Sequence, residues 1–315
     1  MRIEEEKELT PATLINPRTA IVTLVAGRTV RLFDGADEFE AKLRSRSLKV
    51  LLGDHVQVGP DHMITEILPR RTTLMRTFGN QDREFAANVD LLIVVTAPER
   101  LFNTIAIDRA LTIASAANVR TVLVQNKVDL SPEPGSDVYR SIGVEVFQLS
   151  AKFGNGLEEL QKLLADDKIR SVVLLGVSGV GKSTLLNRLV PNAVAKTSTV
   201  SEKIGQGRQT TSQAIGYLMP RGALHSLIVI DLPGAQHLGV SHLSQEQVLA
   251  SFDEFLPFAE KCRYSDCKHM AEPDCGVKRA LDQQQIPQSR YASYIAMIEE
   301  IRDMPDSRKY RRSED

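Results

Sequence analysis

The N-terminal part of the chain alternates short hydrophobic runs with turn signals. The runs TAIVTLVAG, RTVRLF, KVLLGDHVQVG and HMITEIL fall between residue 10 and about residue 75, and each mixes β-branched residues with other apolar ones. The sequences DG, GD and GPD interrupt them. Several short strands at this spacing predict a small β-barrel.

From about residue 88 the pattern changes to strands that alternate with helices. We expect strands at 91–95, 121–125, 144–149, 171–175 and 227–230, and helices at 105–117, at 157–164 and from 181 onward. Such alternation predicts a parallel, doubly wound α/β sheet with helices on its faces. Beyond about residue 245 the pattern is mostly helical.

A glycine-rich segment after the expected strand at 171–175 matches the phosphate-loop pattern GxxxxGK[ST]. It comprises Gly176, Val177, Ser178, Gly179, Val180, Gly181, Lys182 and Ser183, and Thr184 continues it into the expected helix. Glycines let backbone N–H groups curl around the β-phosphate, and the helix N-terminus adds partial positive charge. Lys182 is expected to reach the β- and γ-phosphates, and the Ser183 hydroxyl to ligate Mg²⁺.

The sequence Asn126-Lys127-Val128-Asp129 follows the expected strand at 121–125 and indicates guanine rather than adenine. Ligands of open α/β sheets bind at the carboxyl ends of the strands. There Asp129 can accept hydrogen bonds from the N1–H and the exocyclic amine of guanine. Adenine offers an acceptor and no amine at this position, which would leave a buried charge unpaired.

Three further segments fit the same site. Ser150-Ala151-Lys152 suits a backbone contact to guanine O6, and Asp231-Leu-Pro-Gly234 matches the DxxG element, whose Asp orients Mg²⁺ and whose Gly senses the γ-phosphate. One of Thr210 and Thr211 should complete Mg²⁺ coordination when GTP is bound; the sequence does not distinguish them.

These elements stand in an unusual order along the chain. In Ras-like GTPases the phosphate loop comes first and NKxD follows DxxG, whereas here residues 126–129 and 150–152 precede residues 176–183 and 231–234. Joining the natural ends and opening the chain after DxxG gives the same sheet, because domain termini are often close together. The order predicts a circularly permuted GTPase domain. It also predicts that nucleotide state is transmitted to the C-terminal domain that follows.

All three cysteines of the chain lie between residues 262 and 275, beside a histidine: Cys262, Cys267, His269 and Cys275. Zn²⁺ binds four such ligands tetrahedrally, and a Cys₃His set without a vacancy is structural. A small helical module would gain much of its folding free energy from the ion. Buried free cysteines or a redox pair are the alternatives, and the use of every cysteine at ligand spacing favours zinc.

Composition narrows the class of protein. At 315 residues we expect two or three domains, and 42% hydrophobic with 25% charged residues is typical of a soluble globular protein. No apolar run reaches the roughly 18 residues of a membrane span, and the N-terminus lacks a secretory signal, so we expect a cytoplasmic protein.

A net charge of −1 gives no global reason to expect nucleic-acid binding, so any such binding must depend on local basic patches. Two groups of basic residues are candidates. They are Lys42, Arg44, Arg46 and Lys49 in the barrel, and Arg70, Arg71, Arg76 and Arg83 near the domain junction.

A barrel, a permuted nucleotide domain and a Cys₃His cluster, in that order, resemble the bacterial RsgA (YjeQ) family of GTPases that depend on the small ribosomal subunit. Nearly the whole chain takes part, including VLLGDHVQV, ITEILPRRTTLMR, AANVDLLIVV and GQGRQTTS. The resemblance implies a late assembly factor that binds the small (30S) subunit and its 16S rRNA, with GTP hydrolysis stimulated by that subunit. It also implies a zinc knuckle at the cysteine cluster.

We therefore predict an OB-like β-barrel (1–80), an α/β circularly permuted P-loop GTPase domain (81–244) and a helical zinc-binding domain (245–315). The expected ligands are GTP or GDP with Mg²⁺ and one structural Zn²⁺. We expect a monomer, on which the sequence itself is silent. The competing classes are a GTP-dependent scaffold for a non-ribosomal partner and an ATP-using P-loop enzyme, which Asp129 disfavours.

The residue that positions the attacking water stays open. Ras-like enzymes carry glutamine directly after DxxG, and this chain has Ala235 there. The resembling family commonly has histidine before the switch threonines, where this chain has Gln209; glutamine can orient water but cannot act as a general base. Gln236 and His237 are neighbouring substitutes. We expect slow intrinsic turnover that the ribosome completes.

Overall fold

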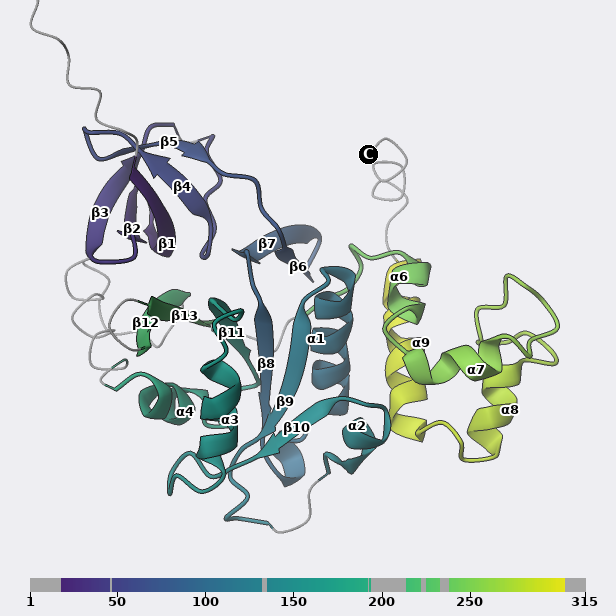
Figure 1. Cartoon of the computed structure of the whole chain (residues 1–315). Helices are drawn as coiled ribbons and strands as arrows, with labels where there is room; N and C mark the ends of the chain where they lie inside the picture. The colour runs from purple at the N-terminus through teal and green to yellow at the C-terminus, as the bar shows by residue number, and fades with distance from the viewer. Residues whose placement is uncertain are drawn as a thin grey trace, which may run out of the picture.

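Figure 1 shows a computed structural model of the chain. It describes residues 18–45, 47–131, 135–191, 193, 214–221, 225–232 and 238–303, with the side chain of residue 225 excepted. No helix within these ranges is long and apolar enough to cross a membrane.

The N-terminal strands close into a five-stranded barrel, as predicted. The strands are β1 (Arg18–Ala26), β2 (Thr29–Phe33), β3 (Glu38–Leu43), β4 (His55–Val58) and β5 (Met63–Ile67). Their order is β1-β2-β3-β5-β4, and antiparallel pairing of β1 with β4 closes it. Alternate side chains point inward because successive residues of a strand face opposite sides, so Val22, Val30 and Ile64 are fully buried.

A separate hairpin joins the barrel to the central sheet. It consists of β6 (Thr73–Phe78) and β7 (Gln81–Ala87), which pair only with each other among the described strands. Arg70 ties the hairpin to the barrel, since its guanidinium donates to Asp54 Oδ1 at 2.7 Å and to Glu84 Oε2 at 2.9 Å. Arg70 of the predicted basic patch therefore has a structural role.

The central sheet is doubly wound, as the alternation of elements predicted. Its strands are β8 (Leu91–Thr96), β9 (Arg120–Gln125), β10 (Glu145–Gln148), β11 (Ser171–Leu175), β12 (Ile215–Arg221) and β13 (His225–Asp231). They lie in the order β10-β9-β8-β11-β13-β12. Every neighbouring pair is parallel except β12 with β13.

Helices cover both faces of this sheet (Figure 1). They are η1 (Glu99–Leu101), α1 (Thr104–Ala116), α2 (Asp137–Ser141), α3 (Leu157–Leu164) and α4 (Lys182–Leu189). Alternate residues of β8 divide between two cores: Leu92 and Val94 belong to the core that contains α1, and Leu91 and Ile93 to the core of α3 and α4. Burial on both faces explains why this strand is a continuous apolar run.

The C-terminal part is helical. Its last helix, α9, packs on α6 within this part and on α1 of the central sheet's helical layer. Its elements are α6 (Gln245–Leu249), η2 (Asp253–Phe255), α7 (Leu256–Ala259), α8 (Gly276–Asp282) and α9 (Gln288–Arg302). Arg290 of α9 is almost fully buried and donates to Asp108 of α1 and to Glu254, each at 2.7 Å. This network crosses the interface between the central sheet's helices and the C-terminal helices.

We predict that Arg290→Met destabilises the protein by about 3–5 kcal/mol, because removal of one partner leaves the buried Asp108 charge uncompensated. Urea denaturation followed by circular dichroism measures the loss. Arg120→Met is the matched control: its ion pair with Glu145 is exposed, so its loss should cost less than about 1 kcal/mol.

The loss of stability caused by Arg290→Met should also depend on pH. Burial raises the pKa of Asp108, and the charge of Arg290 opposes that rise. Without Arg290 the folded-state pKa moves further above the unfolded value. A carboxyl group with a raised folded-state pKa contributes its full stability at pH values below the unfolded-state pKa. That contribution is lost as the pH rises through the folded-state pKa. The stability lost in Arg290→Met should therefore be smaller at about pH 5 than at about pH 7. An equal deficit at both pH values would contradict this origin.

Candidate functional site

The carboxyl ends of five parallel strands meet at one edge of the central sheet. Gln125 of β9 pairs with Gln148 of β10 and with Thr96 of β8, and Asp231 of β13 pairs with Leu174 of β11. The loops that follow these strands therefore start side by side, although they are far apart in the sequence. The structure thus brings residues 126–129, 150–152 and 176–183 and Asp231 to one edge.

Asn126 joins three of these loops directly. Its side chain is buried, its Nδ2 donates to Val180 O at 2.8 Å, and its Oδ1 accepts from Ala151 N at 2.9 Å. Lys127 adds a second tie, from Nζ to Gly179 O at 2.6 Å. A buried amide with both ends satisfied fixes the relative positions of the loops it joins.

Gly181 shows how closely the loops approach. Its φ is +93°, and a Cβ there would lie 2.4 Å from Asn126 Nδ2. Only glycine meets both requirements without strain. The glycine before Lys182 therefore serves the contact between the two motifs as well as the turn of the loop.

Lys182 and Asp231 are the charged groups at the centre of this edge. Lys182 Nζ donates to Gly176 O at 2.6 Å and to Val177 O at 3.3 Å. Burial lowers the pKa of Lys182 and raises the pKa of Asp231, and the charge of each opposes the effect on the other. Asp231 Oδ1 is buried and has no hydrogen-bond partner among the described residues. An unsatisfied buried carboxylate oxygen near Lys182, at the same sheet edge as the exposed Ser183, suits a Mg²⁺ site, since Mg²⁺ prefers oxygen ligands.

The loop at 150–152 is held from the phosphate-loop helix by a residue that the sequence reasoning missed. Arg188 of α4 donates to Ala151 O at 2.8 Å and to Lys152 O at 2.5 Å. Its sequence position, six residues after Lys182 in an ordinary helix, carried no signal of this contact.

The remaining predicted residues divide into two sets. Asp129, Ser183 and Thr184 are exposed at the same edge, while Ser150 is buried. Gln209, Thr210, Thr211, Gly234 and Ala235, with their neighbours Gln236 and His237, lie outside the described residues.

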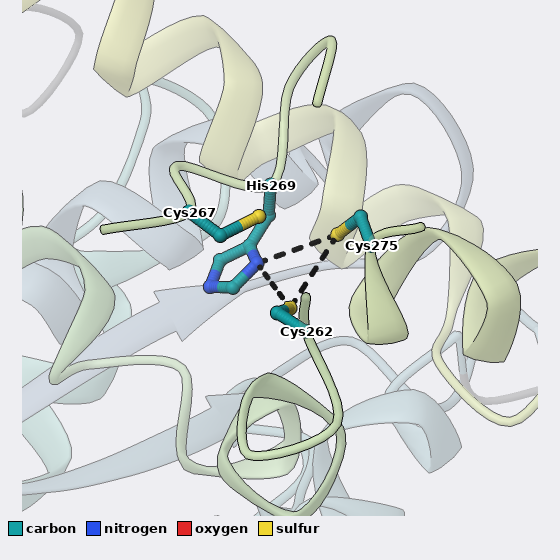
Figure 2. Close-up of side chains that lie close together, drawn as sticks. All are labelled: Cys262, Cys267, His269 and Cys275. Carbon is teal, nitrogen blue, oxygen red and sulfur yellow. Dashed lines mark hydrogen bonds between the residues drawn. The ribbon is translucent and has the colours of Figure 1, made fainter. Parts of the chain in front are cut away.

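The four predicted metal ligands lie together in the C-terminal part (Figure 2), with their ligand atoms all within 4.8 Å of one another. Cys262 Sγ lies 3.8 Å from Cys275 Sγ, and each of these sulfurs lies 3.5 Å from His269 Nδ1. A tetrahedron with Zn–S bonds of about 2.3 Å and a Zn–N bond of about 2.05 Å has edges of about 3.8 Å and about 3.5 Å. These three separations fit a zinc ion.

Surrounding groups orient this cluster. Gly276 N donates to Cys262 Sγ at 3.3 Å, and Lys278 N donates to Cys275 Sγ at 3.5 Å. Tyr291 and Tyr294 of α9 donate to the carbonyls of residues 269 and 268, at 2.7 and 2.9 Å. N–H donors aimed at sulfur and a fixed ligand loop are typical of the outer shell of a metal site.

The protonation states follow from burial. Burial raises the pKa of Cys267 to about 12, raises the pKa of Cys275 and lowers the pKa of His269. A neutral imidazole is ready to ligate, whereas the thiols need a cation to favour their thiolate forms.

A family profile and similar sequences both identify relatives of this chain. The sequence profile of the RsgA GTPase family matches residues 67–241. The small ribosomal subunit biogenesis GTPase RsgA of Bordetella pertussis is 38% identical over 297 residues, covering 90% of this chain and 97% of that protein. The protein of the same name from Haemophilus influenzae is 32% identical over 288 residues, covering 86% of this chain and 81% of that protein.

Solved structures agree with this fold. The crystal structure of YjeQ from Thermotoga maritima aligns with a TM-score of 0.67 at 30% identity, covering 91% of this chain and 99% of that one. YloQ, described as a circularly permuted GTPase, aligns with a TM-score of 0.64 at 22% identity, covering 94% of this chain and 99% of that one; this likeness concerns the fold alone.

Proposed function

The chain belongs to the RsgA GTPase family, and from that premise we propose that it binds the small (30S) ribosomal subunit and assists its late maturation. As a member of the family it is a GTP hydrolase. The observation that carries the GTP-binding part of the proposal is the hydrogen bond between Asn126 and the phosphate loop, because it brings a guanine-type motif and a phosphate cradle to one edge. The biogenesis role comes from the name of the relatives.

Within that site we propose the following roles. Asp129 accepts from guanine, and Asn126 and Lys127 hold the phosphate loop in place beside the base. Ser150 and Ala151 form the loop over guanine O6. The phosphate cradle comprises Gly176, Val177, Ser178, Gly179, Val180, Gly181, Lys182, Ser183 and Thr184.

Mg²⁺ would be held by Ser183 and, through water, by Asp231, together with the nucleotide phosphates. Bound there, the ion would neutralise charge that develops on the phosphates. We propose that Thr210 or Thr211 completes its coordination and that Gly234 senses the γ-phosphate.

For hydrolysis we propose slow intrinsic turnover that the small subunit accelerates. Ala235 cannot orient a water molecule by hydrogen bonding, which supports the need for geometry imposed from outside. Gln209 stays a candidate for that orientation. A free enzyme that turns over as fast as the subunit-bound enzyme would rule out this proposal.

We further propose that the protein binds 16S rRNA, works in the cytoplasm as a monomer, and is organised as domains 1–80, 81–244 and 245–315. Five-stranded barrels of this topology often bind nucleic acid through one face and its loops. Lys42 lies on β3, and Arg44 and Lys49 lie in the segment that follows this strand. Among the described residues none of the three forms an ion pair, so these basic side chains support this part of the proposal.

Sedimentation with purified small ribosomal subunits tests the ribosomal role. The protein should pellet with the subunits in the presence of a non-hydrolysable GTP analogue and much less in the presence of GDP, because the γ-phosphate orders the switch segments. Large subunits are the control. Equal recovery in both nucleotide states, or none with either, would favour a scaffold for a non-ribosomal partner.

We also propose that Cys262, Cys267, His269 and Cys275 hold one structural Zn²⁺. The donor set is complete, so a bound ion would have no open position for catalysis. The small C-terminal core then depends on the ion for part of its stability.

Metal analysis should find about one zinc per chain, and Cys275→Ser should lose it. Its loss should increase amide hydrogen exchange across residues 262–276, while GDP affinity changes little. His62→Asn, at a histidine of the barrel, is the control and should retain zinc. A zinc-free variant with wild-type exchange in this segment would contradict a structural ion.

A further inference from the structure

The segment 238–242, which begins seven residues after Asp231, is held by three parts of the chain that are distant in sequence. These are strand β6, helix α1 and helix α9. The segment connects the central sheet to the C-terminal helices. Its contacts therefore decide how the nucleotide site is joined to the rest of the molecule.

The first contact is with the hairpin. Gly239 and Thr77 exchange two backbone hydrogen bonds, at 2.8 and 3.1 Å, and a Cβ at Gly239 would lie 2.5 Å from Thr77 O. The Thr77 hydroxyl accepts from His242 N at 3.1 Å and donates to Asp82 at 2.8 Å. The two backbones are therefore paired too closely for any residue but glycine at 239 without a shift.

The second contact comes from the last helix. Glu300 Oε1 accepts from Val240 N at 2.7 Å and from Ser241 N at 3.1 Å. Its other oxygen, Oε2, pairs with Arg109 of α1 at 2.6 Å, and Arg109 donates to Leu238 O at 3.2 Å. One carboxylate thus receives two backbone N–H groups and a guanidinium, in a half-buried setting where charge-assisted hydrogen bonds are strong.

We propose that Glu300, with Arg109, is a positioning residue for GTP hydrolysis, because the two side chains fix the backbone of residues 238–241, through which the chain continues from the strand that carries Asp231. This inference rests on the proposed role of residues 231–234. Asp231 lies at the end of β13, and Leu238 is held by Arg109, which pairs with Glu300 of α9.

The same helix contacts the metal cluster, since Tyr291 and Tyr294 hold the backbone of residues 268 and 269. A shift of α9 that is caused by binding at the C-terminal helices would reach residues 240 and 241 through Glu300. It would reach the hairpin through Thr77. The arrangement links the site of hydrolysis to both flanking parts of the molecule.

Kinetics of the full-length protein test the proposal. Glu300→Ala should lower kcat for GTP about tenfold while KM changes less than about twofold, because the residue fixes geometry without touching the nucleotide. Glu300→Gln keeps an acceptor for the two N–H groups and should retain most of kcat. Glu299→Ala, an exposed neighbour on the same helix, is the matched control and should behave as wild type.

Hydrogen exchange separates positioning from a general loss of stability. In Glu300→Ala, exchange should increase at residues 238–242 and in the hairpin, with little change in β8 and β11. If Glu300→Ala does not fold, Glu300→Gln carries the test and should show a smaller increase at the same residues with a partial loss of kcat. Unchanged kcat in the folded alanine variant, or an equal loss in Glu299→Ala, would overturn the proposal.

These kinetic experiments need no ribosomes, so the effect of Glu300→Ala on kcat can be interpreted even if the proposed ribosomal role is wrong. Absence of GTP hydrolysis by the wild type would count against the nucleotide site itself.

Discussion

The buried side chain of Asn126 is the contact on which the nucleotide site depends. Its amide hydrogen-bonds to the phosphate loop and to the loop at residue 151, so three segments from different parts of the sequence share one geometry. Parallel strands make this possible, because their carboxyl ends lie at the same edge whatever order the chain visits them. Permutation therefore changes the connections and leaves the site intact.

The permuted order has a structural consequence beyond the sheet. The chain leaves the central sheet at β13, and the segment that follows is paired with Thr77 and held by Glu300. The contacts that join the hairpin, α1 and α9 thus lie within about ten residues of Asp231 along the chain.

Sequence predicted the elements whose signal is local. The central strands are continuous apolar runs, the phosphate loop has its own spacing, and the Cys₃His spacing placed four ligands together. β3 was missed because Glu38, Glu40 and Lys42 make it charged on one face, and β12 because it is an edge strand that ends in Pro220 and Arg221. Arg188, Arg290 and Glu300 could not be assigned, since each acts through a partner distant in sequence, and side-chain type alone does not identify that partner.

If Asp129 binds the base in the same site in which Lys182 holds the phosphates, then Asp129→Asn should change the nucleotide preference of the protein. Xanthine carries a carbonyl where guanine has its amine, so an asparagine amide suits it better than a carboxylate does. In the Asp129→Asn variant, GTP affinity should fall by about 100-fold, and xanthosine triphosphate should be bound and hydrolysed in its place. Unchanged GTP affinity, or a loss of GTP binding with no gain for the xanthine nucleotide, would contradict it.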